Sequence, residues 1–399
     1  MKKSHYFLIF FATLFSMAYG QIQLSTYSEV SILTIGPGTS LNDAFGHSAI
    51  RIKDPMYRLD IVYDYGRYDF ESDGFYLNFA KGKLNYEIGF TNYKPFLSYY
   101  LSEEREVKSQ TLNLSLGEKQ VFFQKLQQNI LPQNKSYAYD FFYNNCATKI
   151  KDIVASVSEK HLEFEQPQDF KQHTFRALIR SQVEQNSWGG FGIDLALGSV
   201  IDQIAPVNDH MFLPRYIHTF FEVAKFKNTN EPLVKKQEIL NSKQLSVKHS
   251  FWSSPLFIFS ILSFLIVLAT YKNYKSNSRS KWLDVMIFSI TGLIGVVILL
   301  LWFATDHTAT AYNYNLLWAF AFNLLFIPTL LKKRVKKTIY WIPKISFNFI
   351  ISYGTSLEYR GSVIQYWNST TMDSFNSSLC ILMQMVQQKI KSLKKQFKL

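Results

Sequence analysis

Residues 137–157 read YAYDFFYNNCATKIKDIVASV, and this stretch joins a predicted strand to a predicted helix. Its aromatic first part predicts a β-strand over residues 137–143. In the second part, apolar residues recur at helical spacing: Ile150, Ile153, Val154 and Val157. Asparagine is a common helix cap, so Asn145 predicts that Cys146 lies in the first turn of the helix.

Cys146 is the first candidate for chemistry, because the exported domain contains no second cysteine with which it could form a disulfide. The other cysteine of the chain is Cys380. The two cannot pair if the apolar segments between them cross a membrane. Backbone N–H groups at a helix start lower the pKa of a thiol, favour the thiolate nucleophile and can hold an oxyanion. A small buried residue that packs a helix onto a sheet is the other interpretation, and position alone leaves both open.

His47 is the candidate base for this thiol, because it opens a predicted strand at residues 48–52. Asp60 opens the next predicted strand, at residues 60–65, and could orient the imidazole if the two strands pair. Asp64 competes for that role. A structural histidine at a strand edge and solvated strand acids are the alternatives.

The remaining pattern predicts an α+β domain. Strands are expected at residues 30–35, 84–90 and 108–114, and helices at 94–104 and 116–130. Ser115 and Glu118 form a capping box for the second of these helices. Further helices are expected at about 174–185, 193–204 and 214–225, and residues 228–248 read as a polar link.

Charge and hydropathy together predict a membrane protein. The net charge is +13, but residues 21–250 are near neutral, which argues against a nucleic-acid partner. Basic residues instead flank apolar segments at about 255–270, 283–305 and 314–331. Residues 271–281 and 332–337 are rich in Lys and Arg, so the positive-inside rule places them in the cytoplasm.

The N-terminus agrees with this topology. Lys2 and Lys3 precede an apolar run and the small residues at 18–20, as in a signal peptide. The predicted organisation is a signal peptide (1–20), an exported domain (21–250), membrane helices (251–337) and a basic tail of undefined structure (338–399). An uncleaved anchor or a buried helix is the alternative for the first segment.

Two further features of the sequence bear on the chemistry. No His-x-x-x-His or Cys-x-x-Cys pair and no serine-hydrolase elbow occurs, so neither a metal site nor a serine nucleophile is expected. Asp306 and His307 lie in a short loop between two membrane segments, on the exported side. We expect this loop to form part of the floor of the active site, with either residue contacting substrate or the rim around Cys146; an interfacial helix cap is the alternative.

Three separated motifs resemble the Lnb-type lipoprotein N-acyltransferase family. They are FGHSAIRI (45–52), DIVYDYG (60–66) and YDFFYNNCAT (139–148). Residues 193–198, 211–214, 306–307 and 315–318 continue the resemblance, which runs from about residue 24 to residue 328. More distantly, a histidine followed by Asn-Cys resembles the circularly permuted papain-like enzymes, such as lecithin:retinol acyltransferase.

The resemblance implies a permuted papain-like α+β domain in which Cys146 is the nucleophile, His47 the base and Asp60 the third polar residue. Asp64, Asp140, Asn145, Asp306 and His307 are expected around them or facing substrate. The implied reaction transfers an acyl chain from a membrane phospholipid, through a cysteine thioester, to the α-amine of a lipoprotein's diacylglyceryl-cysteine. It needs no metal or organic cofactor.

Two other classes of function stay open. One is a membrane-anchored periplasmic cysteine peptidase or amidase, in which water would release the acyl group. The other is a non-catalytic envelope-binding module with an inert, buried Cys146. The implied location is the bacterial inner membrane, with several spans and the Cys146 domain in the periplasm.

Overall fold

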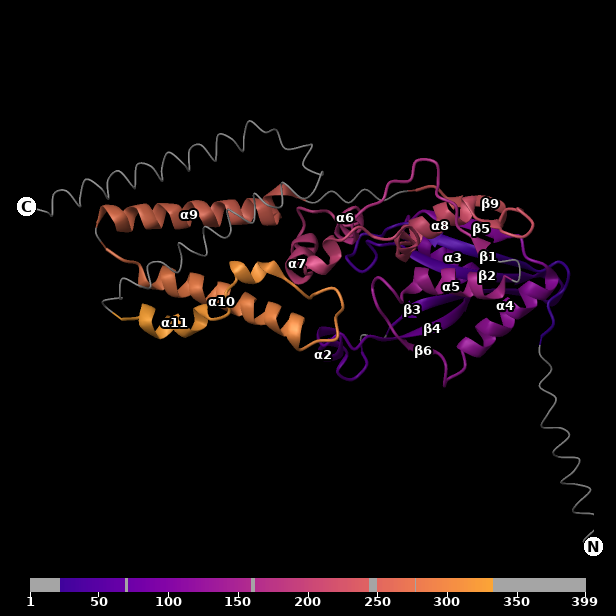
Figure 1. The fold of residues 1–399 in the computed structure, drawn as a ribbon, viewed down its shortest axis with the longest axis horizontal. Helices are drawn as coiled ribbons and strands as arrows, with labels where there is room; N and C mark the ends of the chain where they lie inside the picture. The colour runs from indigo at the N-terminus through magenta and orange to yellow at the C-terminus, as the bar shows by residue number, and fades with distance from the viewer. Residues whose placement is uncertain (1–21, 69–70, 159–161, 244–249, 277, 333–399) are drawn as a thin grey trace, which may run out of the picture. The chain divides into compact units, whose positions relative to one another are not determined.

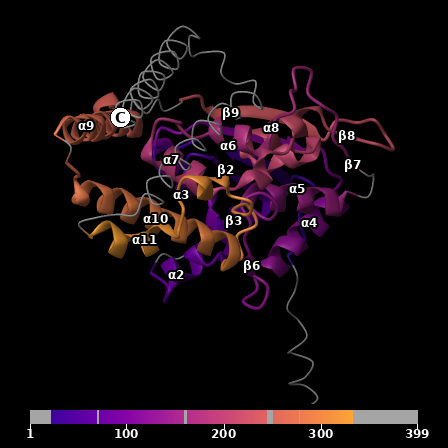
Figure 2. The same ribbon diagram turned by 60° about the vertical axis from the view of Figure 1, so that its left-hand side comes forward.

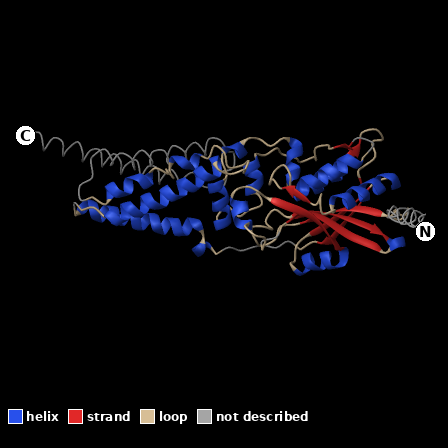
Figure 3. Cartoon of the chain, turned by 90° about the horizontal axis from the view of Figure 1, so that it is seen from below, coloured by secondary structure: helices blue, strands red, loops and turns tan. Residues whose placement is uncertain are grey.

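The structure, a computed structural model, describes residues 22–68, 71–158, 162–243, 250–276 and 278–332. Its N-terminal domain is built on a seven-stranded antiparallel sheet with the order β6-β4-β3-β2-β1-β5-β9 (Figures 1 and 3). The strands are β1 (Glu29–Ile35), β2 (His47–Asp54), β3 (Leu59–Arg67), β4 (Asn85–Asn92), β5 (Val107–Leu112), β6 (Ser136–Ala138) and β9 (Val234–Asn241). A separate short pair is formed by β7 (Leu162–Glu163) and β8 (Lys225–Phe226).

Both faces of this sheet are buried at its centre. Ile32 of β1 pairs with Ile50 of β2, and both belong to the larger core of the domain. The neighbouring pair, Leu33 and Ala49, points to the other face and belongs to a smaller core. The apolar run in β1 therefore reflects a strand that is covered on both sides.

Helices cover the two faces unequally. The larger core contains residues of α4 (Leu116–Asn129), α5 (Cys146–Val157) and α8 (Pro214–Val223), and α4 lies beside α5 (Figure 2). On the other face, α3 (Tyr93–Ser102) contributes Phe96 to the smaller core. The predicted capping box is confirmed, because the Ser115 and Glu118 side chains each accept a hydrogen bond from the other's backbone N–H.

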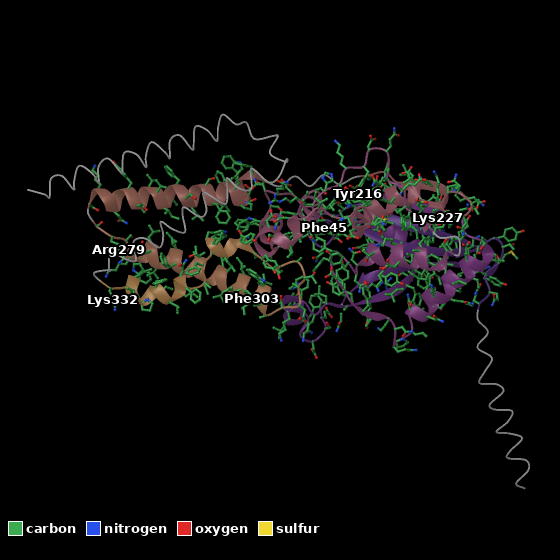
Figure 4. All side chains as sticks on the ribbon, viewed as in Figure 1. Phe45, Tyr216, Lys227, Arg279, Phe303 and Lys332 are labelled. Atoms are coloured by element: carbon green, nitrogen blue, oxygen red, sulfur yellow. The ribbon has the colours of Figure 1, made fainter. Side chains whose placement is uncertain are left out.

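A third apolar cluster lies outside the sheet, in the second half of the domain. It includes α6 (Phe175–Arg180), η2 (Ser199–Asp202) and η3 (Val207–Phe212), while α7 (Trp188–Ala196) packs against it through Ile193. Phe45 and Tyr216, both labelled in Figure 4, also pack against this cluster. Ala309, from the loop after residue 303, is buried within it.

The second half of the chain contributes long apolar helices. α9 (Pro255–Lys275) follows the short η4 (Phe251–Ser253), and α10 (Lys281–Phe303) comes next. Within the described residues, these two helices are long and apolar enough to cross a membrane. Residues 284–294 and 316–332 form a compact unit distinct from the N-terminal domain, whereas residues 295–315 cluster with that domain.

The region expected as a third span differs from the prediction. Residues 314–331 contain η5 (Tyr314–Leu317) and, separately, α11 (Asn323–Leu330). The 8 residues of α11 rise only about 12 Å, against a hydrocarbon core of about 30 Å. The predicted signal peptide and the basic tail lie outside the described residues.

Three other local predictions were wrong. The strand expected at 137–143 ends at Ala138, and the helix expected at 193–204 lies earlier, as α7. Residues 228–248, expected as a link, contain β9, an edge strand whose exposed Lys and Glu side chains gave no strand pattern. A short helix that the pattern did not predict, α2 (Phe75–Ala80), follows β3, and η1 (Pro55–Tyr57) joins β2 to β3.

Candidate functional site

Cys146 is the first residue of α5, and a rigid turn holds it there. The buried Asn145 side chain accepts hydrogen bonds from Ala147 N (2.8 Å) and Thr148 N (2.9 Å) through Oδ1. Thr148 Oγ1 in turn accepts from Asn145 N at 2.8 Å, which completes a capping box. The cap that the sequence predicted is confirmed.

The amide nitrogen of Asn145 fixes this turn to the rest of the domain. Its Nδ2 donates to Phe141 O at 2.9 Å and to Phe212 O at 2.8 Å. Asn145 therefore uses both ends of its side chain, one for the helix and one for the surrounding loops. A backbone held in this way positions the thiol with little freedom to move.

Asp140 shapes the loop before the cap and explains why the predicted strand stops early. Its Oδ1 accepts from Phe142 N (2.8 Å) and Tyr143 N (2.9 Å), and Asp140 and Asn144 exchange backbone hydrogen bonds at 3.2 Å. An aspartate that binds its own downstream N–H groups favours a turn over a continued strand. The aromatic composition alone does not reveal this turn.

The space beside the thiol depends on Gly66. This residue lies at an irregularity in the β3–β4 pairing and has a φ of 90°, a region that favours glycine. A Cβ placed there would lie 3.6 Å from the Cys146 Cβ and 3.7 Å from the Tyr139 ring. Cys146 itself is a free, half-buried thiol.

His47, the first residue of β2, lies between this thiol and a buried carboxylate. Its Nε2 is 3.5 Å from Asp64 Oδ2, on the neighbouring strand β3. The other carboxylate oxygen of Asp64 accepts from Arg67 Nε at 2.9 Å and from Arg67 Nη2 at 2.5 Å. Arg67 therefore fixes Asp64, and Asp64 is in place to orient His47.

The electrostatics of the site favour a charged pair. Burial would raise the pKa of the Cys146 thiol, but the charge of His47, its hydrogen bond and the Ser48 backbone N–H lower it below the ordinary value. Burial likewise opposes a charged His47, yet the electrostatic effects of Tyr100 and Cys146 and the hydrogen bond to Asp64 raise its pKa well above the ordinary value of 6.5. The arrangement can hold a thiolate beside an imidazolium.

Asp60 does not lie near His47, which corrects the prediction that it orients the imidazole. Its carboxylate forms two 2.7 Å hydrogen bonds with the guanidinium of Arg51. In the β2–β3 register Asp60 pairs with Lys53, whereas Asp64 pairs with Ala49, two residues from His47. Asp60 and Asp64 are four positions apart, which corresponds to about 13 Å along the strand. Asp64, the alternative that the sequence analysis allowed, is the carboxylate that lies beside His47.

The loop after α10 contacts the rim of the site, but not through the residues that the sequence singled out. Thr308 Oγ1 donates to Asp140 Oδ2 at 2.8 Å, in the turn that precedes Cys146. His307 Nε2 donates to Phe79 O at 3.0 Å and Asp306 N to Lys81 O at 2.8 Å, so these two residues contact α2 and the turn that follows it.

Sequence reasoning therefore missed Thr308, Arg67 and Tyr139. No motif marks Thr308, because its role follows from a contact between residues 168 positions apart. On a regular strand Asp64 and Arg67 would point to opposite faces, so their pairing depends on the irregularity at Gly66, which no sequence pattern marked. Among the described residues, no group of three or more His, Cys, Asp or Glu side chains is arranged to hold a metal ion.

Fold and site together define a class: a membrane protein with a mixed α/β N-terminal domain, an antiparallel sheet and a thiol at a helix start. A family model described as the Lnb N-terminal periplasmic domain matches residues 15–181, and one described as the Lnb transmembrane domain matches residues 246–388. The chain belongs to the Lnb family, with a periplasmic N-terminal domain and a membrane region. No curated protein and no solved structure matches it significantly.

The extent of these matches differs from the expected resemblance at two places. Residues 193–198 and 211–214 fall between the two matched regions, although their sequences contributed to the resemblance. The transmembrane match also continues through residues 338–388, beyond residue 328, where the expected resemblance ends.

Proposed function

We propose that this chain is a lipoprotein N-acyltransferase of the bacterial inner membrane that carries the acyl group on Cys146. The observation that carries the proposal is the local arrangement of Cys146, His47 and Asp64, in which the pKa of the thiol is lowered and that of the imidazole is raised. Membership of the Lnb family supports a lipid-facing setting for this thiol.

In the first step, the Cys146 thiolate attacks the ester carbonyl carbon of a phospholipid. A C–S bond forms, and the ester C–O bond breaks when the tetrahedral intermediate collapses. The leaving lysophospholipid oxygen takes the proton of the His47 imidazolium, so a thioester and a neutral imidazole remain. Backbone N–H groups at the start of α5, such as that of Cys146, are suited to stabilise the oxyanion.

In the second step, the α-amine of a diacylglyceryl-cysteine attacks the thioester carbonyl. The neutral His47 accepts the proton that the amine loses, the C–S bond breaks and an amide forms. The thiolate and the imidazolium are thereby restored. Asp64 stabilises the charged form of His47 that each cycle passes through, and it needs no proton transfer of its own.

The chain order of these groups supports the proposed relation to permuted papain-like enzymes. His47 lies on a strand of the sheet and Cys146 comes later, at the start of a helix that packs on the same sheet. We propose the same order of roles here, with residues 21–250 as the catalytic domain and Asp64 in place of Asp60.

The test is mass spectrometry of lipoprotein N-termini from cells with and without the protein. The proposal expects N-acylated termini only when the protein is present, and an acyl thioester on Cys146 that hydroxylamine releases. Cys146→Ala and Cys146→Ser should both abolish the product while the protein still inserts in the membrane, because a hydroxyl needs far more activation than a thiol.

Two results would reject the proposal. Unchanged lipoprotein termini together with peptide or amide hydrolysis would make the protein a thiol peptidase or amidase. Wild-type acylation by Cys146→Ala would show that Cys146 does not carry the acyl group.

A further inference from the structure

Helix α2 exposes an unusual share of apolar side chains. Its sequence is FYLNFA, and Tyr76 is 74% exposed, Leu77 59% and Phe79 41%. The helix has six residues and no side-chain cap, so little of its stability can come from its own hydrogen bonds. A contiguous exposed apolar surface of this kind marks a binding or membrane-contact surface.

The contacts of α2 place it next to the end of a membrane helix. α10 ends at Phe303, labelled in Figure 4, and Asp306 N then donates to Lys81 O at 2.8 Å. His307 Nε2 donates to Phe79 O at 3.0 Å. The approach is close, because a Cβ on Gly82 would lie 2.7 Å from His307 N. A backbone hydrogen bond and a side-chain hydrogen bond thus join the loop after α10 to α2 and the turn that follows it.

A second membrane helix is attached to the domain in a similar way. Trp188 of α7 donates from Nε1 to Ser253 O at 2.9 Å, just before α9 begins. Phe191 of α7 then contacts Phe259 of α9, with ring centroids 5.1 Å apart. The end of α10 and the start of α9 are both bonded to the periplasmic domain, and both helices are long and apolar enough to cross a membrane, which argues for a bilayer surface near these contacts.

We propose that α2 is an interfacial helix whose side chains Tyr76, Leu77 and Phe79 insert into the periplasmic leaflet of the membrane. Aromatic and aliphatic side chains on a short surface helix are suited to the boundary between headgroups and acyl chains. Lys81 and Lys83 follow the helix and are exposed, where their ammonium groups can remain at headgroup level.

Inserted in this way, α2 would connect the lipid to the thiol through a row of aromatic rings. The Phe79 and Phe141 centroids are 6.5 Å apart, and those of Phe141 and Tyr139 are 5.4 Å apart. Tyr139 borders the space beside Gly66 that Cys146 also borders. An acyl chain bound to Cys146 would lie along this row; this part of the inference rests on the proposed function.

The insertion itself can be tested without catalysis. A nitroxide is attached to Leu77→Cys in the full chain carrying Cys146→Ser and Cys380→Ser, in nanodiscs of phosphatidylethanolamine and phosphatidylglycerol. Met56→Cys in η1 is the matched control, because Met56 is 65% exposed. We expect oxygen to relax the label at residue 77 strongly and a water-soluble nickel chelate to relax it weakly, with the opposite at residue 56.

Equal access of the nickel chelate to both labels would overturn the proposal, since α2 would then lie in water. Shielding of residue 77 from both reagents would also overturn it, because protein rather than lipid would cover the helix.

An activity measurement separates this inference from the proposed function. Leu77→Asp should slow transfer from phospholipid vesicles about tenfold, the cost of losing one buried leucine. It should leave the rate of Cys146 alkylation by iodoacetamide unchanged. If the wild type transfers no acyl chain while the nitroxide result is as expected, the proposed function is rejected and the proposed interfacial helix is retained.

Discussion

At the scale of residues, the site combines groups whose pKa values move in opposite directions. The thiol pKa of Cys146 is lowered chiefly by the charge of His47, against the effect of burial. The pKa of Asp64 is also lowered, because the hydrogen bond and charge of His47 and those of Arg67 outweigh its burial. Each charge in this group thus depends on its neighbours, and single substitutions should change the titration of the others.

The first prediction concerns the pH dependence of the thiol. Alkylation of Cys146 by iodoacetamide should persist below the ordinary thiol pKa of about 8.5 and fall only as pH drops through the lowered value. In His47→Gln, burial and Asp64 remain and both raise the thiol pKa, so the profile should shift to higher pH. The rates are measured with Cys380→Ser in both proteins. Identical profiles would show that His47 does not set the pKa of the thiol.

The second prediction separates the two aspartates. Asp64→Asn should lower the rate of N-acylation at least tenfold, because it weakens a general base of a kind that contributes about 10²–10⁴. It should also lower the pKa of His47, because Asp64 helps to raise it. Asp60→Asn is the matched control and should change the rate less than about twofold, since its partner is Arg51. The opposite ranking would contradict the geometry.

At the scale of elements, the loop after α10 is joined to the domain along its length. Gly198 N donates to Ala309 O at 2.9 Å, Ser199 N to Tyr312 O at 3.1 Å, and Asn313 Nδ2 to Leu195 O at 2.8 Å. Ala309 is also buried in the cluster around η2 and η3. The loop is thus a structural part of the domain, and Thr308 extends it to the turn before Cys146.

The third prediction tests this attachment. A Cβ at Gly198 would lie 1.7 Å from Ala311 O, so Gly198→Ala must displace the loop. We expect faster hydrogen exchange across residues 304–315 and a lower unfolding temperature. Gly192→Ala is the control, because nothing lies within 4 Å of its added Cβ and alanine favours the helix by up to about 1 kcal/mol. Unchanged exchange in Gly198→Ala would mean that the loop is not held by this contact.

At the scale of the whole molecule, sequence and family agree on a periplasmic domain followed by membrane helices. The Lys- and Arg-rich segment at 271–281 covers the end of α9, the connection and the first residue of α10. The loop from residue 304 to Asn315 contains no Lys or Arg. The periplasmic match supplies the same orientation independently. The Cys146 domain and the loop after α10 thus belong to the same side.

The fourth prediction follows from this orientation. A reporter that is active only outside the cytoplasm should be active when fused after Ser250 and silent when fused within residues 271–281. The silent fusion is combined with a cytoplasmic reporter as a control for expression. The reverse pattern would place Cys146 in the cytoplasm and remove lipoprotein substrates from its reach.

Local sequence signals predicted a large part of this fold. The strands at β1 to β5, the capped helix α4 and the helix that begins at Cys146 were all visible as periodicity or as a capping residue. These features depend on residues a few positions apart, which is why the sequence alone reveals them. β9 and α2 were not predicted, because a charged edge strand and a short exposed helix have no periodic apolar face.

By itself, the sequence determined that Cys146 starts a helix, that His47 starts a strand and that apolar helices follow. The tertiary structure decided which acid serves His47, because the register of β2 and β3 brings Asp64 to it and leaves Asp60 with Arg51. It also decided that the loop after α10 reaches the site through Thr308. Capping and amphipathic spacing are short-range properties, whereas register and loop docking depend on packing between distant segments.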